Sequence, residues 1–249
     1  MNHPQLSVQL YTVEKAFESD PAGTLARIKA MGFSQVEPYN FMDFGDLGET
    51  LRASGLTAPT AHGRFVGMTD AELNVVFASA KRWQIDRVID PYVPPERWQH
   101  AGSVSEIAAQ LNAAAVIAAT HGVTIGYHNH AHELRSVIGS RPALELLAEE
   151  LSPEIGLEVD TFWAEAGGQD AVGLLGRLGT RVVAIHVKDG ATTLDVKDQT
   201  AVGAGSLPIR QILDAAPQAL RVIELDDTVG DRFQAIADSF DYLVGEGLA

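Results

Sequence analysis

Short stretches rich in apolar and β-branched residues alternate along the chain with longer stretches in which apolar residues recur every three or four positions. The first pattern is typical of buried strands and the second of amphipathic helices. A helical stretch follows each predicted strand, so we expect the strands to pair in parallel through right-handed crossovers. Eight strands are predicted, at residues 6–11, 35–39, 57–62, 87–90, 123–130, 155–160, 182–187 and 221–225.

Capping residues indicate where the helices begin and end. Asp20 followed by Pro21 is typical of a helix N-terminus, with the carboxylate as N-cap and the proline at the first helical position. Thr69 with Glu72 three residues later predicts a capping box. The glycines expected to end helices are Gly32, Gly55 and Gly122. Further helices are predicted at 103–121, 141–150, 170–178, 207–215 and 231–244.

Eight strand–helix units in a chain of 249 residues match the (β/α)8 TIM barrel. An open, doubly wound α/β sheet would show the same alternation. The barrel is favoured because no G-x-G-x-x-G motif follows the first strand. No linker divides the sequence, so we expect a single α/β domain that spans residues 1–249.

The composition excludes several classes of function. Without cysteine, the chain has no disulfide framework, thiolate nucleophile, cysteine-ligated zinc or iron–sulfur cluster. A net charge of −15 repels phosphate backbones and anionic lipid surfaces, so neither a nucleic-acid nor a membrane partner is expected. Residues 1–5 do not begin a signal peptide, and no apolar stretch approaches the roughly 20 residues of a membrane span. We therefore expect a cytoplasmic protein.

Ionisable residues gather at the predicted strand ends. In TIM barrels the chemistry takes place at the C-terminal ends of the strands. Imidazoles and carboxylates that converge there predict a site for one divalent metal ion. This mixed ligation suits Mn²⁺, Co²⁺, Zn²⁺, Mg²⁺ or Fe²⁺. The residues concerned are Glu37, His62, His128, His130, Asp160, His186 and Glu224.

Three motifs in the second half of the chain resemble the xylose-isomerase-like TIM-barrel superfamily: GLEVDT at 156–161, AIHVKD at 184–189 and VIE at 222–224. The opening LSVQLYT at 6–12 and the glycine-rich VGAGSL at 202–207 are also similar to this group. The superfamily includes sugar and sugar-phosphate isomerases and epimerases, inosose dehydratases and endonuclease IV. The resemblance covers nearly the whole chain.

The resemblance implies which residues bind the metal. Relatives take one ligand from each of strands 5 to 8, usually Glu, Asp, His and Glu, and Asp160, His186 and Glu224 match the last three. The chain departs from this pattern at strand 5, where His128 stands in place of the glutamate. The implied ligands are therefore His128, Asp160, His186 and Glu224, with Glu133 as the alternative to His128.

A divalent ion can polarise the carbonyl of a keto sugar and stabilise the enediolate that forms when the α-proton leaves. Glu224 is the first candidate for the base, and His130 or His128 would act on the opposite face. The predicted function is a metal-dependent isomerase or epimerase of a keto sugar or sugar derivative. The alternative is a lyase, either an inosose-type dehydratase or a 3-keto-glycoside eliminase. The missing strand 5 glutamate favours this alternative, because elimination does not need two equivalent carboxylates.

Four further residues are candidates for binding the small-molecule sugar. Glu37 and His62 would reach its hydroxyls, although Glu37 is also consistent with a buried, paired carboxylate. Trp163 would stack on a sugar face or pack in the interior, and Lys188 would bind a substrate oxygen or pair with Asp189. Since relatives form dimers and tetramers, the resemblance also implies that the chain can form a homo-oligomer.

Overall fold

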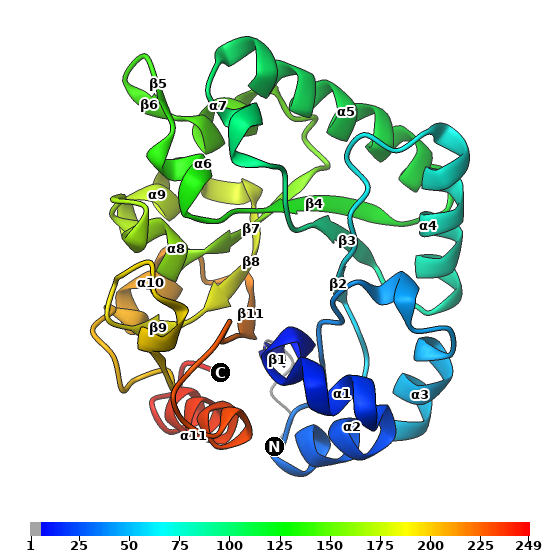
Figure 1. Ribbon diagram of the computed structural model, residues 1–249, viewed down its shortest axis with the longest axis vertical. Coiled ribbons are helices and arrows are strands. Elements are labelled where there is room, and N and C mark those ends of the chain that lie inside the picture. The colour runs from blue at the N-terminus through cyan, green and yellow to red at the C-terminus, as the bar shows by residue number, and fades with distance from the viewer. Residues whose placement is uncertain (1–5) are drawn as a thin grey trace.

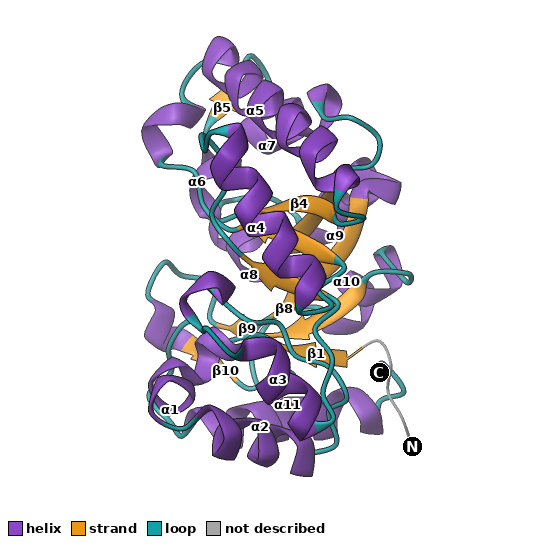
Figure 2. Ribbon diagram, turned by 90° about the vertical axis from the view of Figure 1, so that its right-hand side faces the viewer, coloured by secondary structure: helices purple, strands orange, loops and turns teal. Residues whose placement is uncertain are grey.

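The computed structural model describes residues 6–249; Met1–Gln5, where the predicted domain begins, lie outside the described residues. Parallel strands curl into a barrel, and helices surround it (Figures 1 and 2). The predicted TIM barrel is thus confirmed. The strand order is β1-β11-β8-β7-β4-β3-β2. These strands are β1 (Leu6–Val8), β2 (Thr60–His62), β3 (Arg87–Asp90), β4 (Thr124–His128), β7 (Gly156–Asp160), β8 (Val182–Val187) and β11 (Leu220–Ile223).

The predicted strand at 35–39 is the exception, because it forms only isolated bridges. Gln35 pairs with Thr57, and Glu37 pairs with Gln9. Backbone hydrogen bonds on both sides, such as Glu37 N to Val8 O at 2.8 Å, close the barrel between β1 and β2. Pro38 follows immediately and has no N–H to continue a ladder. Within residues 6–249 the barrel therefore has seven regular strands and one segment held by bridges.

The predicted caps are present at the helix ends. The carboxylate of Asp20 accepts a hydrogen bond from Gly23 N, and Thr69 and Glu72 form the capping box. Gly55 has a φ of 68°, in the left-handed region expected of a helix stop. The main helices are α2 (Pro21–Ala30), α3 (Leu47–Ser54), α4 (Asp70–Arg82), α5 (Ala101–Thr120), α7 (Ala143–Glu150), α9 (Ala171–Leu178), α10 (Ile209–Ala215) and α11 (Arg232–Gly245).

Several short elements in the connections were not predicted, because they are too brief to show a repeat in the sequence. They comprise helices α1 (Glu14–Ser19), α6 (Ala131–Arg135) and α8 (Thr161–Ala166), and the strand pairs β5 (Val137–Ile138) with β6 (Arg141–Pro142) and β9 (Asp189–Gly190) with β10 (Gln199–Thr200). The 3-10 turns are Leu10–Val13, Phe41–Asp43, Pro95–Trp98, Gly179–Arg181 and Val196–Asp198. None of the helices in the described residues is long and apolar enough to cross a membrane.

The apolar core fills the layer between the strands and the helices. The interior of the barrel near the C-terminal ends of the strands is polar. Side chains alternate along a strand between the outside and the inside of a barrel. Leu157 and Val159 on β7 belong to the apolar core, whereas Glu158 and Asp160 between and after them are buried polar residues. This alternation places two carboxylates of one strand inside the barrel.

A buried carboxylate anchors the long connection that follows β8. Asp189 accepts hydrogen bonds from the backbone N–H groups of Gly190 (2.8 Å), Gly203 (2.9 Å), Gly205 (3.1 Å) and Leu207 (3.0 Å). A Cβ atom on Gly205 would lie 2.1 Å from Asp189 Oδ1, so glycine is required there. The glycine-rich segment thus wraps around this one carboxylate and fixes the loop against the barrel end.

We predict that Asp189→Asn lowers the free energy of unfolding by about 3 kcal/mol, because an amide nitrogen would face N–H donors and leave buried groups unpaired. Urea denaturation followed by circular dichroism measures the change. Asp195→Asn is the control, since Asp195 also accepts a backbone hydrogen bond in this loop but is exposed. Equal stability of the two variants would show that Asp189 does not anchor the loop.

Candidate active site

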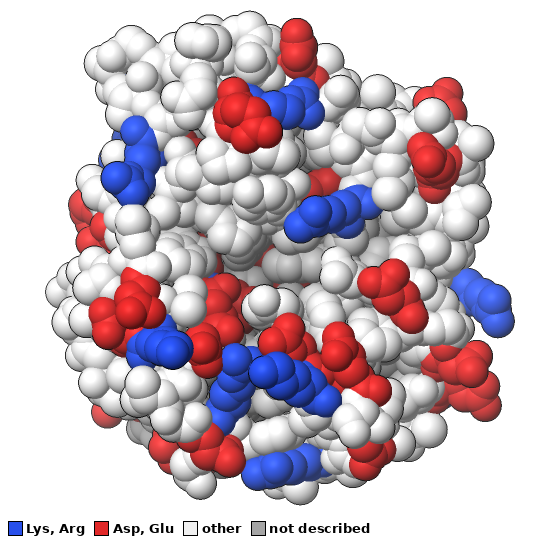
Figure 3. Space-filling model, viewed as in Figure 1, with Lys and Arg blue, Asp and Glu red and all other residues white. Residues whose placement is uncertain are grey.

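A pocket of about 220 Å³ opens at the C-terminal ends of the strands. Acidic side chains lie along the edge of the hollow in the middle of the face shown in Figure 3. Aromatic rings and imidazoles form much of its wall. The lining residues are Tyr11, Tyr39, Asn40, His62, Arg64, Pro91, Tyr92, His128, His130, Glu224 and Asp226.

The four predicted metal ligands lie together at the floor of this pocket: His128 and Glu224 line it, and Asp160 and His186 are buried against them. Asp160 ends β7, His186 lies on β8, and Glu224 directly follows β11. One ligand atom from each of these three lies within 4.8 Å of the others, and His186 Nδ1 is 2.7 Å from Glu224 Oε2. His128, at the end of β4, places its Nε2 atom 4.0 Å from Asp160 Oδ2. Residues from four separate strand ends therefore converge.

Glu133, the alternative to His128, is turned away from this group. Its carboxylate accepts hydrogen bonds from Tyr127 Oη at 2.7 Å and from His130 N at 2.9 Å. Glu133 thus caps the start of α6. His128, at the end of β4 (the fifth strand of the prediction), is the residue that faces Asp160.

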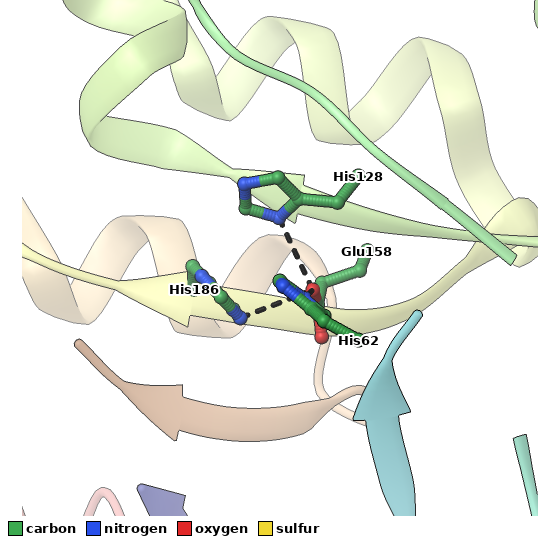
Figure 4. A group of neighbouring side chains, drawn as sticks. All are labelled: His62, His128, Glu158 and His186. Carbon is green, nitrogen blue, oxygen red and sulfur yellow. Dashed lines mark hydrogen bonds and ion pairs between the residues drawn. The ribbon is translucent and has the colours of Figure 1, made fainter. Parts of the chain in front are cut away.

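A residue that the sequence analysis did not select lies at the centre of the barrel. The Oε2 atom of Glu158 is 2.6 Å from His62 Nε2, 3.1 Å from His128 Nδ1 and 3.0 Å from His186 Nε2 (Figure 4). These four residues form a second group that could hold a metal ion. The signal in the sequence was the two-residue spacing from Asp160, which puts both carboxylates inside the barrel.

Of the four predicted sugar-binding residues, only His62 lines the pocket. Glu37 is fully buried, and its Oε1 atom lies 2.8 Å from both Gln9 Nε2 and His186 Nε2. It is the paired, buried carboxylate of the alternative interpretation. Trp163 is also buried. Its backbone N–H donates to Asp160 Oδ1 at the start of α8.

Lys188 does not pair with Asp189, which was one of its two alternatives, because Asp189 is occupied by backbone N–H groups. The Lys188 ammonium lies 2.9 Å from Asp160 Oδ2, 2.6 Å from Glu224 Oε2 and 2.6 Å from Asp226 Oδ2. Burial lowers the pKa of Lys188, but these three carboxylates outweigh it and hold the pKa well above its ordinary value. Lys188 is therefore a fixed positive charge at the pocket floor.

The histidines of the site differ in charge. Burial lowers the pKa of His186, but Glu158 and Glu224 outweigh it and raise the pKa well above its ordinary value. Burial and the neighbouring charge of His186 lower the pKa of His128 to about 3. Burial also holds the pKa of His130 well below its ordinary value. At neutral pH the rings of His128 and His130 are therefore uncharged.

The two carboxylates of the pocket floor also differ. Burial raises the pKa of Asp160 to about 6, although Lys188 opposes this shift. The pKa of Glu224 is held well below its ordinary value, because the charges of Lys188 and His186 outweigh burial. Glu224 is thus ionised across the physiological range of pH.

Comparisons with known proteins agree with this architecture. The family model described as xylose isomerase-like TIM barrel matches residues 25–219. No curated protein matches the chain in sequence.

Solved structures give likenesses over nearly the full chain. A sugar phosphate isomerase/epimerase from Parabacteroides distasonis has a TM-score of 0.79 at 20% identity and covers 96% of this chain and 92% of its own. A probable 3-DHS dehydratase involved in petrobactin synthesis, from Bacillus anthracis, has a TM-score of 0.72 at 14% identity, with 98% and 99% covered. The structure of the IOLI protein with a bound zinc atom has a TM-score of 0.69 at 14% identity and covers 97% of this chain and 98% of its own. At these identities the likenesses show the fold.

The buried Glu133 provides a test by pH. Burial raises its pKa to about 7 from an ordinary value of 4.5, so the native state holds a proton that the unfolded chain loses. The stability that the native state gains by holding this proton is fully present below pH 4.5 and is lost as the pH rises through 7. We predict that the free energy of unfolding of the wild type, relative to Glu133→Gln, falls by roughly 3 kcal/mol over this range.

The glutamine can accept from His130 N and donate to Tyr127 Oη, so both contacts of Glu133 can be kept in the variant. Urea titrations at several pH values measure the difference. A difference that does not change with pH would contradict the raised pKa.

Proposed function

Because the chain belongs to the xylose isomerase-like TIM barrel family, we propose that it is a divalent-metal-dependent isomerase or epimerase of a keto sugar or a sugar derivative. The observation that carries this proposal is the convergence of Asp160, His186 and Glu224 at the floor of the pocket, with ligand atoms within 4.8 Å of one another.

The donor set fits one divalent ion. Together with His128, the three residues offer two imidazole nitrogens and two carboxylates, a combination that suits Mn²⁺, Co²⁺, Zn²⁺, Mg²⁺ or Fe²⁺. His128 is uncharged and Glu224 is ionised, as ligation requires, whereas His186, whose pKa is raised, would release a proton when an ion binds. The bound zinc in the structure of the IOLI protein supports an ion in this fold.

When bound, such an ion supplies Lewis-acid polarisation of the sugar's carbonyl and stabilises an enediolate. Proton transfer then falls to residues of the pocket wall. His130 lines the pocket and its ring is uncharged. An uncharged imidazole has a nitrogen lone pair that can accept the α-proton. Glu224 lines the same pocket and remains the candidate for the opposite face.

The neighbouring groups of the pocket would hold the sugar. His62 lines the wall and can bind a hydroxyl, while Tyr11, Tyr39 and Tyr92 offer ring faces and hydroxyls. Lys188 lies below, where its charge can stabilise negative charge that develops on a substrate oxygen. We propose His62 and the three tyrosines, which line the pocket, as the binding surface for a small sugar.

The second candidate function is a lyase that dehydrates an inosose or cleaves a 3-keto-glycoside. Two observations favour it. His128 supplies an imidazole where a second carboxylate base would be needed, and Glu224 is engaged by both Lys188 and His186. Elimination needs only one base near the α-proton, and His130 satisfies this. The structural neighbour named as a probable dehydratase shows the same fold.

We predict that Asp160→Ala and His186→Ala each weaken Mn²⁺ or Co²⁺ binding on the order of 100-fold or more, and abolish turnover of the substrate, because each removes a ligand. Isothermal titration calorimetry measures the binding, and circular dichroism checks the fold. His121→Ala is the control, since His121 bonds to the exposed Asn74, outside the residues that line the pocket. Wild-type protein that binds no ion would overturn the proposed function.

Exchange in D₂O separates the two candidate reactions. An isomerase or epimerase is expected to incorporate deuterium from the solvent at a carbon of the ketose while the carbon skeleton and substituents remain. A lyase is expected to release water or an aglycone. One-dimensional NMR of the metal-loaded protein with candidate ketoses, inososes and 3-keto-glycosides distinguishes these results, and loss of a substituent would reject the isomerase proposal.

A further inference from the structure

Three imidazole rings converge on one carboxylate oxygen beneath the pocket floor. Glu158 Oε2 is 2.6 Å from His62 Nε2, 3.1 Å from His128 Nδ1 and 3.0 Å from His186 Nε2 (Figure 4). Glu158 is fully buried, and its other oxygen, Oε1, has no hydrogen-bond partner among the described residues. The Oε2 atom therefore carries the whole interaction of this side chain with the rings.

Two of these rings lie between Glu158 and the two carboxylates among the proposed metal ligands, Asp160 and Glu224. The Nδ1 atom of His128 faces Glu158, while its Nε2 atom lies 4.0 Å from Asp160 Oδ2. The Nε2 atom of His186 faces Glu158, while its Nδ1 atom lies 2.7 Å from Glu224 Oε2. The two nitrogens of an imidazole point in nearly opposite directions, so a bond at one nitrogen fixes where the other points.

We propose that Glu158 is a positioning residue of the metal site: it accepts the N–H groups of His128 Nδ1 and His186 Nε2, and so directs the opposite nitrogen of each ring toward Asp160 and Glu224. This inference rests on the proposed function, because it takes His128 and His186 as ligands. A carboxylate behind a ligating histidine fixes the tautomer and orientation of the ring and increases its basicity.

The neighbouring Glu37 cannot take this role for both rings. Its Oε1 atom lies 2.8 Å from His186 Nε2 and 3.2 Å from His62 Nε2, and none of its described contacts reaches His128. Glu158 also lies on β7, two residues before Asp160, so one rigid strand carries both a proposed ligand and the residue that orients two others.

Glu158→Gln tests the inference. An amide can accept from one ring, but its NH₂ group would face the N–H of the other, so that ring must turn or change tautomer. We expect Co²⁺ binding, measured by calorimetry, to weaken by about 10- to 100-fold. We also expect the ¹⁵N signals of His128 or His186 in the metal-free protein to show a changed tautomer or protonation state, which a purely structural role would not produce.

Glu37→Gln is the matched control, because it alters a buried carboxylate that contacts His186, His62 and Gln9 but has no described contact with His128. It is expected to leave the ¹⁵N signals of His128 unchanged and to weaken Co²⁺ binding less. If Glu158→Gln does not fold, Glu158→Asp keeps the buried charge but withdraws the oxygen by about one bond length, and is expected to weaken Co²⁺ binding as well.

The outcomes separate this inference from the proposed function. If the wild type binds Co²⁺ and the Glu158 variant that folds binds it equally well, the positioning role is overturned while the metal site stands. A third result would be weaker Co²⁺ binding with unchanged tautomers and a visible spectrum of bound Co²⁺ that shows a lost ligand. In that case Glu158 is itself a ligand, and the inference is overturned. If the wild type binds no Co²⁺, the proposed function fails first.

Discussion

Burial of charge is the constraint on which this structure depends. Glu37, Glu158, Asp160, His186 and Lys188 are all buried inside the barrel, where water cannot solvate them. An ionised group in such an environment is tolerated only when it is paired and hydrogen-bonded. Each group therefore fixes the position of its neighbours, and loss of one partner would leave the next charge uncompensated.

The network has two levels, and the imidazoles connect them. Glu37 and Glu158 lie below, and Asp160 and Glu224 lie above with Lys188 between them. His186 contacts both levels, through Nε2 to the lower carboxylates and through Nδ1 to Glu224. Because these contacts are short and buried, the side chains at the pocket floor are held in place before any substrate arrives, which is the preorganisation that electrostatic catalysis requires.

The loop after β8 connects this network to the outer part of the barrel. Asp189 accepts hydrogen bonds from the backbone of the loop. Within the loop, Gln199 Nε2 donates to Asp226 Oδ2, and Gln199 Oε1 accepts from Asp226 N. Asp226 in turn contacts Lys188 at 2.6 Å. A chain of hydrogen bonds thus runs from the loop backbone to the charge at the pocket floor, so that the folding of the loop and the position of Lys188 depend on each other.

The sequence by itself determined the barrel and the edge at which its ionisable residues meet, because apolar periodicity, caps such as Asp20 and Thr69, and strand ends such as Asp160 are local features. Only the tertiary structure decided the direction and partners of the side chains. It placed His128 rather than Glu133 beside Asp160, paired Lys188 with three distant carboxylates instead of the adjacent Asp189, and brought Glu158 beneath three histidines. These contacts join residues that are far apart in the chain, as between Glu37 and His186. Their geometry depends on how the barrel closes, which no local pattern of residues contains.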